Sequence, residues 1–178
     1  MLSRLLIVSL TAMAIAGCGS SPKQAQPMRP ASLPKAPRPA IAAISPADYV
    51  ANASAIDLYV IKASELALQR STTVRVREVA TRLISAHQGS SAQLSMSGRR
   101  LNLVPGAELD PRHRVLLEQL YSSAAFDRDY ARQMQSIHQE AVLLHSGYAA
   151  TGGSPTLTQV AKVLAPIMEQ QTRLVSYL

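Results

Sequence analysis

Apolar residues recur at helical spacing over three stretches of the chain. The stripes consist of Val76, Val79, Leu83, His87 and Leu94; of Phe126, Tyr130, Met134, His138, Ala141 and His145; and of Leu157, Val160, Leu164, Met168, Gln171, Val175 and Leu178. Positions three, four or seven residues apart lie on one face of an α-helix. Each stripe is apolar except at one or two polar positions. The pattern therefore predicts long helices that each bury one face.

Helix boundaries are marked by capping residues and by proline. A capping side chain directly precedes a proline, which is typical of the first residues of a helix, at Ser45-Pro46, Asp110-Pro111 and Ser154-Pro155. A further start, at Ser71-Thr72, lacks the proline. Pro166 lies inside the third stripe and is expected to kink the last helix or to restart it.

These signals predict four long helices, over residues 46–69, 72–99, 124–150 and 155–178, and a shorter helix over residues 111–121. Short turns join most of the long helices, which favours antiparallel neighbours. The predicted fold is all-α: an antiparallel four-helix bundle with a short extra helix in the long connection. This single domain would occupy residues 46–178.

Residues 1–17 have the pattern of a bacterial export signal. Arg4 supplies a positive charge, and the apolar run over residues 5–14 is shorter than the roughly 20 residues of a membrane-spanning helix. The run ends at Ile15-Ala16-Gly17-Cys18, which resembles the lipobox of bacterial lipoproteins. The resemblance implies cleavage before Cys18 and lipidation of its thiol. Two or three acyl chains would then anchor the protein stably to a membrane.

The residue after Cys18 bears on which membrane this is. Gly19 stands where an aspartate, in Gram-negative lipoproteins, favours retention in the inner membrane. The resemblance therefore implies an anchor in the outer membrane, with the domain in the periplasm. Cys18 is also the only cysteine of the chain, so no intramolecular disulfide can form.

Residues 18–45 are expected to join the lipidated cysteine to the domain as a proline-rich, basic tether. Its prolines and basic residues are Pro22, Pro27, Pro30, Pro34, Pro37 and Pro39, with Lys23, Arg29, Lys35 and Arg38. A segment without apolar periodicity cannot bury a core, and its prolines make it an extended spacer. Its charge favours contact with anionic lipid head groups or with another envelope polyanion.

The net charge of +7 raises the question of a nucleic-acid partner, but only 4% of the residues are aromatic and an exported protein seldom meets nucleic acid. The expected partners are the membrane, through the lipid anchor, and an envelope protein or anionic envelope polymer. The oligomeric state is left open.

His113, between Arg112 and Arg114, is expected on an exposed basic edge, and His145 is expected to be partly buried near a helix end.

Several short segments resemble one bacterial family. They are Tyr49-Val50, Asp57-Leu58-Tyr59, Glu65-Leu66-Ala67-Leu68, residues 83–87, residues 125–130, residues 134–138 and Leu164-Ala165-Pro166-Ile167. The most specific element is a Phe-Asp-Arg run before Tyr130, with His138 eight residues after this tyrosine. On these residues the globular part is similar to exported ferritin-like domains of unknown function, often labelled "predicted outer membrane protein". The resemblance implies a ferritin-like bundle, here on a lipoprotein, without an established activity.

The polar interruptions of the stripes lie at similar heights along the predicted helices. Asp57 and His87 lie about 13 and 15 residues from the turn that joins their helices. His138 also lies near the middle of its helix, and Gln171 comes close to the same level. We therefore expect one inward polar layer, made of Asp57, His87, His138 and Gln171. Its expected role is to fix the register and pairing of the helices through hydrogen bonds.

A di-iron site at this layer lacks its carboxylates. Ferritin-like di-iron proteins use Glu-x-x-His pairs, whereas Ile84 and Gln135 stand three residues before the two histidines of this chain. The family resemblance implies an acidic residue directly before each histidine, where this chain has Ala86 and Ile137. It also implies a histidine that is often present on the last helix, at the position of Gln171.

Two functions follow from these residues. A mononuclear metal site of His87, His138 and Asp57 is chemically allowed and would make the chain a degenerate ferritin-like metal-binding or redox protein. The sequence contains no nucleophile elbow, phosphate loop or metalloprotease motif. We therefore predict a non-catalytic domain for interaction or structural support, without metal or cofactor, and keep the metal-binding or redox protein as the alternative.

Overall fold

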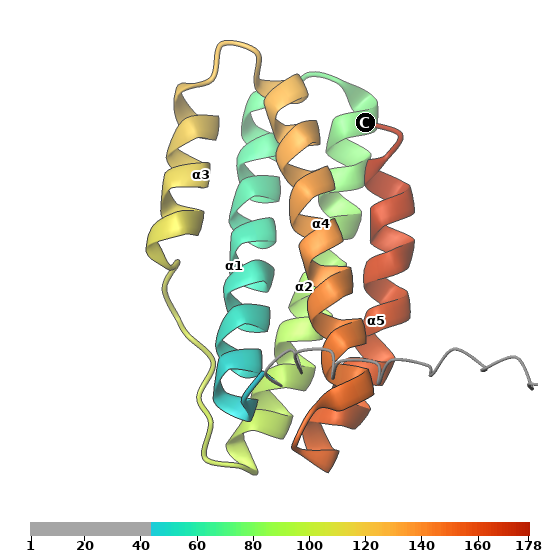
Figure 1. Ribbon diagram of the computed structural model, residues 1–178. Coiled ribbons are helices and arrows are strands. Elements are labelled where there is room, and N and C mark those ends of the chain that lie inside the picture. Colours follow the sequence, from blue (N-terminus) through green and yellow to red (C-terminus); the bar gives the residue numbers. More distant parts are fainter. Residues whose placement is uncertain (1–43) are drawn as a thin grey trace, which may run out of the picture. The chain divides into compact units, whose positions relative to one another are not determined.

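The computed structural model describes residues 44–178. This part of the chain forms five helices and no strand: α1 (Pro46–Arg70), α2 (Val74–Arg99), α3 (Pro111–Ser122), α4 (Phe126–Thr151) and α5 (Pro155–Val175) (Figure 1). The prediction of an all-α fold is thereby confirmed. None of these helices combines the length and apolar composition needed to cross a membrane. The expected signal peptide, Cys18 and nearly all of the tether lie outside the described residues.

Three helices begin where the capping residues predicted. Ser45 accepts a hydrogen bond from the backbone N–H of Asp48, and α1 starts at the following proline. Asp110 and Ser154 likewise accept from the backbone three residues ahead, at the starts of α3 and α5. Each bond satisfies one of the N–H groups that a helix start leaves free.

The starts of α2 and α4 each lie two residues later than expected. Before α2, Ser71 Oγ accepts from the backbone N–H of Thr73 at 3.1 Å, and Thr73 Oγ1 donates to Asp127 Oδ2 at 2.6 Å. Before α4, Ser123 Oγ accepts from the backbone N–H of Ala125 at 3.0 Å. These side-chain bonds hold the connecting residues outside the helices.

Pro166 does not restart the last helix. It lies within α5, which continues to Val175. A proline removes one backbone hydrogen bond, but residues on both sides of it, Leu164 and Met168, are fully packed in the core. The loss of one bond is therefore tolerated, and of the two expected effects, a kink or a restart, the restart does not occur.

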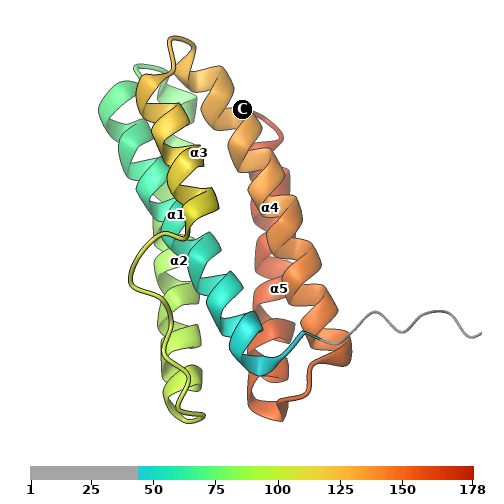
Figure 2. The same ribbon diagram turned by 60° about the vertical axis from the view of Figure 1, so that its left-hand side comes forward.

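The four long helices surround one apolar core. Helix α1 packs against α2 and α4, and α5 packs against the same two helices. Three-residue connections join α1 to α2 and α4 to α5, so both pairs run antiparallel (Figures 1 and 2). The shorter α3 lies against α1 and α4 on the outside (Figure 2). This packing brings polar side chains from α1, α2 and α4 together in the interior.

Candidate functional site

Three residues from three helices form a chain of buried hydrogen bonds. His87 of α2 contacts Asp57 of α1 through Nδ1, at 2.7 Å from Oδ1, and contacts His138 of α4 through Nε2, at 3.3 Å from the other Nε2. The Nδ1 atom of His138 lies 2.7 Å from the backbone carbonyl oxygen of Met134. Asp57 is 1% exposed and both histidines are fully buried. The chain is thus sealed from solvent.

The partners of the ring nitrogens assign the protons. A carbonyl oxygen can only accept, so His138 Nδ1 donates to Met134 and His138 Nε2 carries a lone pair. With Asp57 Oδ1 as its acceptor at 2.7 Å, His87 Nδ1 also donates. Without a further proton, the two Nε2 atoms would present lone pairs to each other at 3.3 Å. The contact is favourable only when a proton or another cation lies between them.

His138 is the neutral partner of this pair. Burial, followed by the nearby charge of His87, lowers the pKa of His138 to about 3, although the bond to Met134 opposes this shift. His138 is therefore neutral near pH 7. His87 then contacts Asp57 through Nδ1 and faces the lone pair of the neutral His138 through Nε2.

Asp57 has a second partner that the sequence analysis did not single out. Ser91 Oγ, one helical turn after His87, donates to Asp57 Oδ2 at 3.2 Å. The sequence spacing could have identified Ser91, because residues four positions apart, such as His87 and Ser91, lie on the same face of a helix. Both carboxylate oxygens of Asp57 are therefore bonded.

Gln171 does not join this chain of hydrogen bonds. Its side chain is buried on α5, but its Oε1 atom has no hydrogen-bond partner among the described residues. The structure thus connects three of the four residues of the expected polar layer. Helical spacing predicts the face and the height of Gln171, but not the direction of its terminal amide.

His145 takes part in a separate buried contact. Tyr49 Oη lies 2.9 Å from His145 Nδ1, and the Tyr49 ring stacks on Tyr148 at 4.0 Å between centroids. His145 is 1% exposed, so the expectation of partial burial is wrong. Burial is the main cause that lowers the pKa of His145 to about 4; the charge of His87 adds to it and that of Asp57 opposes it.

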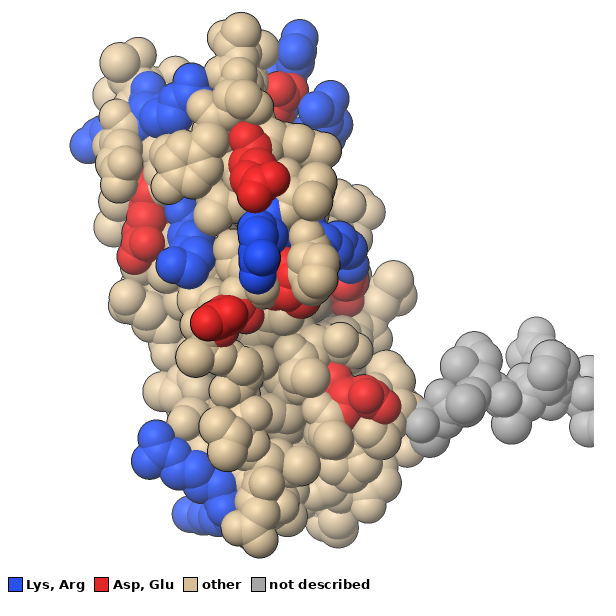
Figure 3. Space-filling view, turned by 90° about the vertical axis from the view of Figure 1, so that its left-hand side faces the viewer, with Lys and Arg blue, Asp and Glu red and all other residues tan. Residues whose placement is uncertain are grey.

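His113 is buried, and its expected place on an exposed basic edge is wrong. Its Nδ1 atom bonds to Asp110 Oδ2 at 2.6 Å, and its ring lies 5.1 Å from that of Tyr59. Asp110 also caps α3, so its two carboxylate oxygens hold the backbone N–H and the imidazole of His113. On the face that Figure 3 shows, basic and acidic side chains are intermixed.

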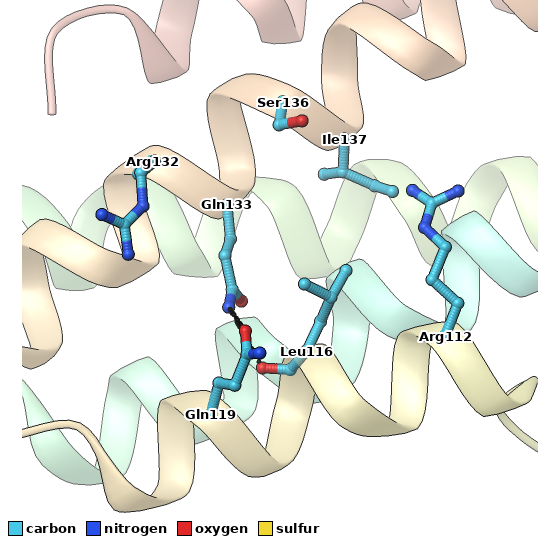
Figure 4. A pocket seen from close by; sticks show the side chains of 7 residues that line it. All are labelled: Arg112, Leu116, Gln119, Arg132, Gln133, Ser136 and Ile137. Carbon is cyan, nitrogen blue, oxygen red and sulfur yellow. Dashed lines mark hydrogen bonds between the residues drawn. The ribbon is translucent and has the colours of Figure 1, made fainter.

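A pocket of about 250 Å³ lies between α3 and α4 (Figure 4). The two arginines that line it are already paired: Arg112 with Glu140 and Arg132 with Asp129. Gln133 Nε2 donates to the carbonyl oxygen of Leu116 at 3.1 Å. None of the residues of the buried histidine chain lines this pocket. With its cations neutralised, we assign it no ligand.

The histidine pair has the spacing of two ligands on one metal ion. Two imidazole nitrogens that each lie about 2.0–2.1 Å from a tetrahedral ion are about 3.3 Å apart, and the two Nε2 atoms here are 3.3 Å apart. Among residues 44–178, no group of three or more His, Cys, Asp and Glu side chains is placed to hold a metal ion. The pair therefore offers two nitrogen donors, with Asp57 behind one of them as an orienting partner.

Two solved structures resemble this fold. One is described as CopM in the Cu(II)-bound form, with a TM-score of 0.62, 18% identity, and coverage of 73% of this chain and 92% of that chain. The other is described as CopM in the Cu(I)-bound form, with a TM-score of 0.62, 15% identity, and coverage of 75% and 94%. At these identities the likeness concerns the fold alone.

No curated protein matches the sequence. A family model matches residues 30–178, which is most of the chain and includes all five helices. The chain therefore belongs to the family described as Domain of unknown function (DUF4142).

Proposed function

We propose that this chain is an envelope lipoprotein whose helical domain binds one copper ion between Nε2 of His87 and Nε2 of His138. The observation that carries the proposal is the 3.3 Å contact of these two atoms. Both rings use Nδ1 as a donor, so both Nε2 atoms are free to act as ligands. A metal ion would replace the proton that now makes the contact favourable.

Asp57 supports the proposed site through Nδ1 of His87, the ring nitrogen that would not bind the metal. A carboxylate that accepts the second N–H of a metal-bound imidazole fixes the tautomer of the ring and raises its basicity. Asp57 Oδ1 lies 2.7 Å from His87 Nδ1, and the carbonyl oxygen of Met134 has the same role for His138. Both ligands would therefore be oriented before the ion arrives.

Copper is preferred among the metals that imidazole binds. The two similar solved structures carry Cu(II) and Cu(I) by their descriptions. That likeness concerns a protein with 15–18% identity, so it supports the choice of ion and not the choice of residues. The residues are supported by the geometry of this chain alone.

A ferritin-like four-helix bundle is part of the proposal. It is supported by the antiparallel pairs α1–α2 and α4–α5, and by the contacts of α1 with α4 and of α2 with α5. Ferritin-like bundles place metal ligands on facing helices. The site proposed here differs from a di-iron site because it has two imidazoles and a single carboxylate.

Copper binding is tested by loading the purified protein with copper under reducing and under oxidising conditions, followed by removal of free metal. We expect one equivalent in at least one of the two states. His87→Gln and His138→Gln should each abolish it. His145→Gln is the matched control, since it makes the same change at a buried position of α4, and it should retain the copper. Copper that is absent from the wild type, or that persists in both ligand variants, would favour interaction or structural support instead.

The anchor is proposed from the lipobox at Cys18, with the outer membrane and a periplasmic domain as the location. Cys18→Ala should prevent lipidation, so the protein should leave the detergent phase of a membrane partition. The basic tether gives only salt-screened adhesion and should not retain the variant at high salt. A processed Cys18→Ala protein that stays on membranes in high salt would contradict the lipoprotein assignment.

A further inference from the structure

We infer that one end of the bundle docks on the surface of a membrane that contains anionic phospholipid. This charge-poor end consists of residues 83–104, residues 141–161 and the start of α1. The docking surface is independent of the copper site and takes only the lipid anchor from the proposed function. It is supported by the distribution of charges along the helices, by two arginines beside an exposed apolar side chain, and by the place where α1 begins.

Charged side chains are unevenly distributed along the long helices. Residues 83–98, which form the second half of α2, contain no Asp, Glu, Lys or Arg, and the same is true of residues 141–161, which end α4 and begin α5. These stretches meet at one end of the bundle, because α2 and α4 end there and α5 begins there (Figures 1 and 2). Water-exposed surfaces normally carry many charges. Their depletion is typical of a surface that contacts a partner.

Two arginines and one apolar side chain follow the uncharged half of α2. Arg99 and Arg100 are exposed, and none of the ion pairs among the described residues includes either of them. Val104 is 84% exposed. The turn before it is held by the backbone N–H of Leu103, which donates to the carbonyl oxygen of Gly98 at 2.9 Å. Cations beside an exposed apolar side chain suit anionic lipid head groups and the apolar layer beneath them.

The carboxylates near this end leave the two arginines unneutralised. Asp48, in the first turn of α1, accepts a hydrogen bond from Ser45 Oγ at 2.6 Å. Glu108 follows Gly106, whose backbone N–H donates to Ser54 Oγ at 3.3 Å. Ser54 lies about two helical turns into α1, so Glu108 is set back from the tip. Figure 3 shows basic side chains at the lower tip of the face in view.

The start of α1 favours a membrane over a soluble partner. Helix α1 begins at Pro46, and its antiparallel pairing with α2 places this start beside the end of α2 (Figure 1). The tether and the proposed anchor at Cys18 precede α1 in the sequence. The basic residues of the tether would be attracted to the same anionic surface. The charge-poor end is therefore the end that the anchor would bring to the membrane.

The test places a fluorescent label at either end of α2 in the full-length lipidated protein. Val104→Cys labels the charge-poor end, and Val74→Cys, at a position 70% exposed at the start of α2, is the matched control. The protein is reconstituted into phosphatidylcholine vesicles with and without phosphatidylglycerol, and quenching by iodide in the water is measured. We expect the label at position 104 to be protected on vesicles with phosphatidylglycerol, and the label at position 74 to remain accessible.

The arginines are tested in the same labelled protein. One arginine near an anionic surface contributes about fivefold to binding. Arg99→Gln combined with Arg100→Gln should therefore lower the ratio of docked to undocked domain about 25-fold and expose the label at position 104. Arg75→Gln combined with Arg82→Gln is the matched control, since it removes two charges from the other half of α2. It should leave the protection unchanged.

The outcomes separate the docking surface from the anchor. Equal quenching at positions 104 and 74 on vesicles with phosphatidylglycerol would overturn the docking surface and leave the anchor intact. Protection at position 104 in detergent without vesicles would indicate contact between protein molecules and would also overturn it. A label that attaches to Cys18 of the wild type would reveal a free thiol and overturn the anchor, whereas protection at position 104 by added vesicles would still support the docking surface.

Discussion

Replacing each histidine of the pair by leucine should destabilise the domain by unequal amounts. His87→Leu leaves Asp57 as a buried carboxylate with Ser91 as its remaining partner. A buried carboxylate that loses its main partner costs about 3–5 kcal/mol. His138→Leu leaves one N–H of His87 and the carbonyl oxygen of Met134 without their partner. Unsatisfied buried groups of this kind cost about 1–3 kcal/mol.

The free energy of unfolding of metal-free protein should be measured by urea denaturation, followed by far-ultraviolet circular dichroism. His87→Leu should lose more stability than His138→Leu. The double variant should cost less than the sum of the two, because residues in one network couple by about 0.5–3 kcal/mol. Equal and additive losses, both below about 0.5 kcal/mol, would refute the hydrogen-bond chain as the stabilising unit.

Three further predictions concern the interior and α3. The folded-state pKa values of His138 (about 3) and His145 (about 4) lie below the unfolded value of about 6.5, so the unfolded chain binds more protons on acidification. The stability that the two neutral histidines contribute should therefore be fully present above about pH 6.5 and fall by about 2 kcal/mol per histidine between pH 7 and 5. A free energy of unfolding that stays constant over this pH range would contradict burial of the neutral rings. Tyr49→Phe removes the bond to His145 and should cost about 1 kcal/mol in denaturation, whereas Tyr148→Phe should be near neutral because the Tyr148 hydroxyl has no partner among the described residues; equal costs would contradict this assignment. Arg70 donates to three carbonyl groups at the end of α3, so Arg70→Met should speed amide hydrogen exchange in α3 more than in α1, and unchanged α3 exchange would contradict its role.

Much of the fold could be predicted from short sequence patterns. Ser45, Asp110 and Ser154 mark three helix starts because a cap and the following proline act within four residues of each other. The starts of α2 and α4 were not accessible in the same way. The bond between Thr73 and Asp127 joins residues far apart in the sequence, and no local pattern reports it.

For the site, the sequence predicts only the level of each polar residue along its helix. Counting residues from the turns places Asp57, His87 and His138 at one level, and the structure links these three by hydrogen bonds. The direction of a side-chain end depends on its neighbours in space. Spacing alone therefore did not predict that Gln171 leaves its amide oxygen unpaired, or that His113 turns inward.

The proposed metal site at His87 and His138 is tested by ¹⁵N NMR of histidine-labelled protein with and without one equivalent of Ag(I). Silver is diamagnetic and has nuclear spin, so a ring nitrogen bound to it shifts and splits. We expect these changes at Nε2 of His87 and Nε2 of His138, with Nδ1 of both rings still protonated. Splitting at His113 or His145, or no silver-dependent change at the pair, would contradict it.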